Sequence, residues 1–178
     1  MLRLKMFAVG ILAGLGALVL EFIISIIYPG FDSGIQAISF PLIISAVIEE
    51  SLKFGMIRKI FDRFKISFFL NSILIGLGFA AAEFFFNVLR HSSELGLFHF
   101  SYLGLFLIHS ATAAIFGYYF LKHGDSILSG FFILSLAAIL HFSFNTAVIL
   151  GLNYGIIYLT LSILIIILVH LARKSYPF

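Results

Sequence analysis

Ionisable and amide side chains lie inside long apolar segments of this chain, where charge is costly. Moving a charged side chain to the centre of a bilayer costs about 2.5 to 3.5 kcal/mol on insertion scales, so a charge retained there needs a partner or a function. Four segments carry such residues, and the set comprises Glu49, Glu50, Lys53, Glu83, Asn87, His109, His141 and Asn145. Because they are few and concentrated, we treat them as a candidate site.

Helical spacing places several of these residues on shared faces. Side chains three or four positions apart lie on the same side of a helix. The groups joined in this way are Glu49 and Glu50 with Lys53, Glu83 with Asn87, and His141 with Asn145. Four helices can therefore direct polar faces into one pocket.

The adjacent carboxylates Glu49 and Glu50 suggest acid–base chemistry. Two carboxylates in low-dielectric surroundings repel, so they need a cation, a shared proton or a metal, and Lys53 is the nearest cation. A carboxylate in such surroundings is a suitable general base for activating water.

Carboxylate and imidazole groups also suggest a metal site. A catalytic zinc ion takes three protein ligands and keeps one open position, and Glu83, His109 and His141 would supply such a set. Without a metal, water would be activated by carboxylate and histidine, and Asn145 with His141 would stabilise the oxyanion. The sequence leaves both routes open, so zinc or another divalent metal is one expectation.

Structural roles are the alternative for each residue taken singly. His109 alone would serve as a hydrogen-bonding group between helices. Glu49 or Glu50 would form an ion pair with Lys53, and Glu21 would lie at the membrane interface near the end of the first segment. The joint occurrence of glutamates and histidines on four segments favours a functional site.

Composition indicates the elements that position these residues. Apolar residues make up 62% of the 178 and charged residues 11%, whereas soluble domains have about 45–50% and 25%. Apolar runs broken by charges and turn residues predict an all-α, polytopic transmembrane bundle forming a single domain over residues 1–178. About six spans are expected, at 6–28, 35–57, 67–89, 97–121, 126–150 and 153–171. Glycines at short spacing, Gly10 with Gly14 and Gly76 with Gly78, predict close helix packing.

The distribution of basic residues predicts the orientation. With the N-terminus in the cytoplasm, nearly all lysines and arginines outside the spans fall on one side, and Arg90 is alone on the other. This asymmetry predicts that both termini are cytoplasmic. Cysteine is absent, which excludes disulfides and thiolate zinc sites, and the net charge of +3 gives no reason to expect a nucleic-acid partner.

Four motifs follow one another between residues 49 and 145. They are Glu49-Glu50-x-x-Lys53, the run from Gly76 to Glu83, His109-Ser-Ala-Thr112 followed by Gly117, and His141-x-x-x-Asn145. Their order and spacing resemble the motif series of PrsW-type intramembrane proteases. The glutamate pair and the final HxxxN are also similar to those of the wider superfamily of CAAX prenyl endopeptidases and bacteriocin-processing proteins.

The resemblance implies an all-helical core with a site buried in the membrane and proteolysis of a membrane protein or peptide. It implies catalytic roles for Glu49, Glu50, Glu83, His109, His141 and Asn145, with Lys53 and Asn87 in support. The family usually has asparagine directly after the third glutamate, where this chain has Phe84. Asn87, one turn later, is the candidate replacement.

We therefore expect an intramembrane endopeptidase in which Glu49 or Glu50 activates water, aided by Glu83, His109 and His141. One alternative is a proton- or ion-coupled transporter, since buried glutamate and histidine relays are also expected there. Another is an inactive membrane scaffold with the same polar cluster. The expected location is the plasma membrane of a prokaryote, with the lipid bilayer and a membrane-embedded substrate as partners.

Overall fold

The part of the chain that the computed structural model describes is entirely helical. It covers residues 2–27, 35–61, 68–90, 100–124 and 127–149, together with a few positions between 163 and 174. Five long helices follow in order: α1 (Leu2–Ile27), α2 (Ile35–Phe61), α3 (Phe68–Arg90), α4 (Phe100–His123) and α5 (Ile127–Ile149). The predicted all-α membrane fold is confirmed.

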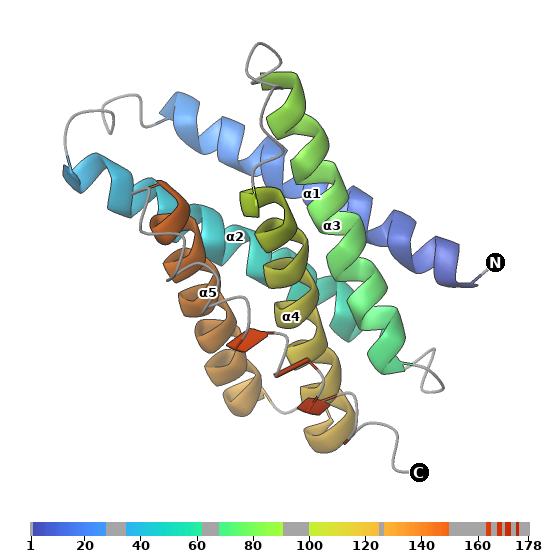
Figure 1. The fold of residues 1–178 in the computed structure, drawn as a ribbon. Coiled ribbons are helices and arrows are strands. Elements are labelled where there is room, and N and C mark those ends of the chain that lie inside the picture. Colours follow the sequence, from blue (N-terminus) through green and yellow to red (C-terminus); the bar gives the residue numbers. More distant parts are fainter. Residues whose placement is uncertain are drawn as a thin grey trace.

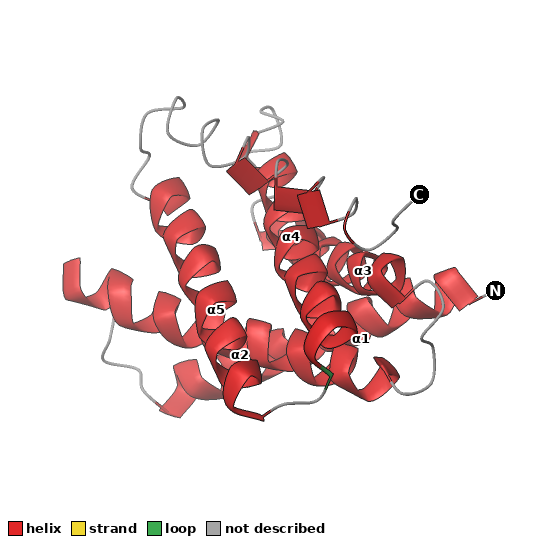
Figure 2. Ribbon diagram, turned by 90° about the horizontal axis from the view of Figure 1, so that it is seen from below, coloured by secondary structure: helices red, strands yellow, loops and turns green. Residues whose placement is uncertain are grey.

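The helices form one bundle in which α4 lies between α3 and α5 (Figure 1). Helices α1 and α2 run obliquely to these three, and the crossing remains visible in the second view (Figure 2). The main contacts join α1 to α3 and α3 to α4, while α2 packs on α1, α5 and α4. Polar faces from α2, α3, α4 and α5 therefore meet near the middle of the bundle.

The first five predicted spans agree with helices to within a few residues. The clearest difference is in α2, which continues through Arg58 and Lys59 to Phe61, so the break predicted at 58–65 begins later than expected. After α4, Gly124 adopts a φ of 64° and its N–H binds the carbonyl oxygen of Phe120, which ends the helix. The sixth predicted span, 153–171, lies almost wholly outside the described residues.

Four of the described helices, α1, α3, α4 and α5, are long and apolar enough to cross a membrane. Helix α2 is equally long but carries Glu49, Glu50 and Lys53 in its middle. All three of these side chains are buried against the other helices. Apolar side chains on the outer faces of α1, α2 and α5 remain exposed, among them Leu12, Val47 and Phe131. This pattern of polar inside and apolar outside is that of an integral membrane protein.

Glycine allows the backbones of α1, α3 and α4 to approach closely, as the spacing predicted. A Cβ atom on Gly10 would clash with the backbone of Ile75, and one on Gly78 would clash with the backbone of Phe7. On the opposite side of α3, a Cβ on Gly76 would clash with the carbonyl oxygen of His109. Gly76 therefore fixes how near α3 lies to the histidine of α4.

Candidate active site

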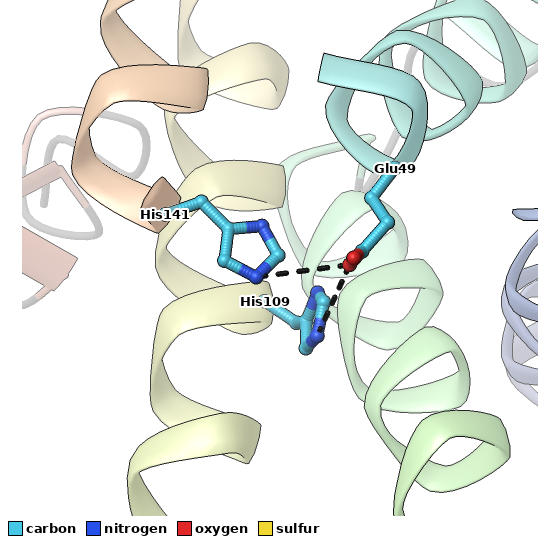
Figure 3. A group of neighbouring side chains, drawn as sticks. All are labelled: Glu49, His109 and His141. Carbon is cyan, nitrogen blue, oxygen red and sulfur yellow. Dashed lines mark ion pairs between the residues drawn. The ribbon is translucent and has the colours of Figure 1, made fainter. Parts of the chain in front are cut away.

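Glu49, His109 and His141 form a buried cluster contributed by α2, α4 and α5 (Figure 3). The Nε2 atoms of His109 and His141 lie 3.8 and 3.7 Å from Oε2 of Glu49. One nitrogen or oxygen from each residue lies within 4.8 Å of the other two. The three side chains thus converge on one point from three different helices.

Two atoms of this cluster are buried without a hydrogen-bond partner among the described residues. They are Oε2 of Glu49 and Nε2 of His141. A buried polar atom left unpaired costs about 1–3 kcal/mol, so such atoms indicate a missing ligand, ion or water. Both atoms can accept a hydrogen bond, but no donor from the described part of the chain lies in the gap between them. A cation in this gap would therefore satisfy both atoms.

Glu50 lies on the Nδ1 side of the His141 ring, away from this gap, and fixes the orientation of that ring. Its Oε1 lies 2.7 Å from Nδ1 of His141 and also accepts from the ammonium group of Lys53. A hydrogen bond from Nδ1–H to a carboxylate places the only ring hydrogen of neutral His141 on that nitrogen. Nε2 of His141 is then left with a free lone pair directed at Glu49, the arrangement typical of a metal-ligating histidine.

Lys53 connects the carboxylate pair to α4. Its Nζ binds Glu50, lies 2.9 Å from Nδ1 of His109 and donates to Oγ1 of Thr112 at 3.0 Å. Nζ also lies 5.0 Å from the centre of the Phe79 ring. A protonated lysine has three hydrogens and no acceptor, so these contacts use its full capacity. Lys53 therefore neutralises Glu50 and orients His109.

Glu83 of α3 reaches the same site through His109. Its Oε2 lies 2.6 Å from Nε2 of His109, and 21% of its side chain is exposed, against 6% for Glu49. The ring of His109 packs between Phe79 and His141, with ring centres 4.9 and 4.8 Å away. Glu83 is thus the more exposed of these two glutamates.

A cavity of about 490 Å³ opens beside the cluster. Its polar lining includes Glu49, Glu83, Asn87 and Asn145, whereas Glu50 is not among the described residues that line it. Its apolar lining comes from all five long helices, with residues such as Leu18, Leu42, Phe79, Leu105 and Val148. The carboxylates of Glu49 and Glu83 form a polar end of the cavity beside the cluster, and the rest of the lining mixes apolar side chains with polar ones. This arrangement suits an extended chain with a peptide group at the polar end.

The structure brings together the residues that the sequence singled out. Glu49 lies in the middle of α2, which extends to Phe61. Phe84 packs on Tyr102 and Phe106 of α4, with ring centres 5.0 and 5.9 Å away. It is not one of the described residues that line the cavity. Asn87 does line it, as the proposed replacement should.

Two residues at the site were not among those that the sequence placed there. Ser45 was not singled out from the sequence, and Glu21 was expected at the membrane interface. Oγ of Ser45 lies 2.8 Å from Oε1 of Glu49 and 2.6 Å from Oε1 of Glu21. Glu21 lines the cavity and is partly buried, so its side chain faces the inside of the bundle, and the interfacial role expected for it stays a prediction. The sequence feature that could have identified Ser45 is its spacing from Glu49, one helical turn apart on α2.

The residues present fit a divalent metal. Two histidines and one glutamate are one of the ligand sets of catalytic zinc, and ligands at about 2.0–2.1 Å in a tetrahedron stand roughly 3.3 Å apart. The distances of 3.7 and 3.8 Å from Glu49 to the two imidazoles are close to that value. A metal at Nε2 of His109 would displace the hydrogen that this atom donates to Glu83. Because Lys53 donates to Nδ1 of the same ring, that contact would have to give way so that Nδ1 carries the ring hydrogen.

Comparison with known proteins agrees with this site. The PrsW family of intramembrane metalloproteases matches residues 1–171, nearly the whole chain. No curated protein and no solved structure matches the chain significantly. The family match covers α1 to α5 and all the residues of the cluster. The apolar helices, the buried glutamates and histidines and the family match lead to one conclusion: this chain is an integral membrane protein and belongs to the PrsW family of intramembrane metalloproteases.

Proposed function

We propose that this protease holds a divalent metal with Glu49, His109 and His141, and that Glu83 is its general base. The observation that carries the metal assignment is the pair of buried atoms without partners, Oε2 of Glu49 and Nε2 of His141. A bound metal would act as a Lewis acid and polarise the carbonyl of the scissile peptide bond. The ligand set of Glu83, His109 and His141 expected from the sequence is the competing assignment.

Glu83 suits the role of base because it is the more exposed carboxylate at the polar end of the cavity. Its carboxylate would accept a proton from the attacking water and return it to the leaving amine. Before a metal binds, Oε2 of Glu83 lies 2.6 Å from Nε2 of His109, so the side chain is already directed at the cluster, and a metal at Nε2 would take the place of that contact. If Glu83 is instead a ligand, Glu49 is the remaining cavity carboxylate and takes the role of base.

The other polar residues would hold the reacting groups in place. Asn145 lines the cavity one turn from His141, so its amide is placed to donate to the developing oxyanion. Glu50 would fix the ring of His141, and Lys53 would offset the charge of Glu50. These assignments give Glu50 a positioning role and leave the proton transfer to a cavity carboxylate.

The cavity supports a membrane-embedded peptide as the substrate, and the plasma membrane of a prokaryote stays the location that we propose. Apolar walls would accept a spanning segment, while the polar end would receive a peptide bond made accessible by local unwinding. The test is cleavage of a panel of single-span peptides in detergent, with products identified by mass spectrometry. Glu83→Gln and His141→Ala should each abolish cleavage. Full cleavage by both variants would refute the proposal.

A further inference from the structure

Glu21 is a carboxyl group on α1 that none of the proposed catalytic steps uses. It lies within an apolar helix long enough to span a membrane, where an ionisable side chain is costly. Its side chain lines the same cavity as Glu49. Neighbouring cavity residues on α1, Gly14 and Ala17, are small and apolar, so Glu21 is the exception on that wall.

Ser45 joins Glu21 to Glu49. Its hydroxyl oxygen lies 2.6 Å from Oε1 of Glu21 and 2.8 Å from Oε1 of Glu49, both short enough for strong hydrogen bonds. Ser45 comes one helical turn before Glu49, so the two side chains share a face of α2. The three residues form a continuous chain from α1 to the cluster.

The contact with Ser45 holds the carboxylate of Glu49 with one oxygen directed at the histidines. Because Oε1 is held by Ser45, Oε2 is the oxygen directed at His109 and His141, at 3.8 and 3.7 Å. Without Ser45, the carboxylate would rotate freely about its terminal bond, whose torsion is broad. Oriented in this way, Glu49 needs no reorganisation to bind a cation.

Hydrogen counting explains why the partner of Ser45 should be a carboxyl group. A serine hydroxyl has one hydrogen, so it can donate to only one of its two carboxyl neighbours. The other short contact needs a hydrogen supplied by the second carboxyl group. Glutamine at position 21 can supply that hydrogen through its amide, whereas leucine cannot.

We propose that Glu21 is a positioning residue that acts through Ser45 to fix the carboxylate of Glu49 as a metal ligand. This inference rests on the proposed role of Glu49 in metal binding. It adds α1 to the helices that build the site. Outer residues that orient a metal ligand typically affect affinity by about 10–100-fold.

The test measures Zn²⁺ affinity of detergent-purified protein without a histidine tag, by competition with a fluorescent chelator. Ser45→Ala and Glu21→Leu should each weaken Zn²⁺ binding by about tenfold or more. Glu21→Gln should stay close to wild type. The visible spectrum of the Co²⁺-loaded protein should change in Ser45→Ala and Glu21→Leu and not in Glu21→Gln, which a loss of general stability would not produce.

Controls separate the positioning role from folding and from the proposed function. Ser25→Ala removes an exposed hydroxyl of α1 that bonds only within its own helix, to the carbonyl of Phe22, and should change nothing. Glu49→Gln should lose Zn²⁺ binding if the proposed ligand set is right. Loss in Glu49→Gln with wild-type affinity in Ser45→Ala and Glu21→Leu would overturn the positioning role alone. Wild-type affinity in Glu49→Gln would overturn both ideas.

Discussion

Glu49 and Glu50 are adjacent in sequence but face opposite sides of the site. Glu49 lines the cavity and directs Oε2 at His109 and His141, whereas Glu50 has no exposed surface and binds Lys53 and His141 through Oε1. Oε2 of each glutamate has no hydrogen-bond partner among the described residues. Successive residues of a helix point about 100° apart, so one carboxylate can meet the metal and substrate while the next supports the histidine. Their substitutions should therefore have different consequences.

Glu50→Gln should lower the stability of the protein and change the cavity little. The substitution leaves the buried ammonium of Lys53 without its carboxylate, and breaking a buried ion pair on one side costs about 3–5 kcal/mol. Thermal unfolding in detergent measures this loss. Glu50→Gln combined with Lys53→Met should recover part of the stability, because no unpaired charge then remains. A single variant as stable as wild type would contradict the structural role of Glu50.

Asn145→Ala should lower kcat and leave KM nearly unchanged. Removing one donor from an oxyanion site costs about 10²–10³ in kcat, because the donor acts mainly in the transition state. Steady-state cleavage of a single-span peptide gives both constants. Ser143→Ala, an exposed position on the same helix that bonds its own backbone, is the matched control. An unchanged kcat would remove Asn145 from the mechanism.

Gly76→Ala should displace His109 without changing any polar side chain. The added methyl would meet the carbonyl oxygen of His109 and lie 2.9 Å from Cβ of Ala113, so α3 and α4 must separate. We expect lower thermal stability, weaker Zn²⁺ binding and slower cleavage together. Gly55→Ala is the control, because no atom lies within 4 Å of its Cβ and alanine favours a helix by about 0.5–1 kcal/mol. Equal behaviour of the two variants would contradict the packing role of Gly76.

Much of the fold followed from the sequence because apolar length alone identifies a membrane helix. The polar residues of α2 to α5 could be grouped because charge inside such a helix demands a partner. The division of roles could not be predicted, since it depends on which way Glu49 and Glu50 point once α2 packs on α4 and α5. The contact between Glu21 and Ser45 could not be predicted for the same reason: only the oblique packing of α1 on α2 brings the two residues together.

In the mechanism that we propose, Glu49 ligates a metal while Glu83 acts on the substrate. The most direct test is metal content by mass spectrometry on untagged, detergent-purified protein, for wild type, Glu49→Gln, Glu83→Gln and His141→Ala. We predict about one divalent ion per chain in wild type and Glu83→Gln, loss of the ion in Glu49→Gln and His141→Ala, and no cleavage by Glu83→Gln. Retention of the metal in Glu49→Gln with its loss in Glu83→Gln would exchange the two roles and contradict this account.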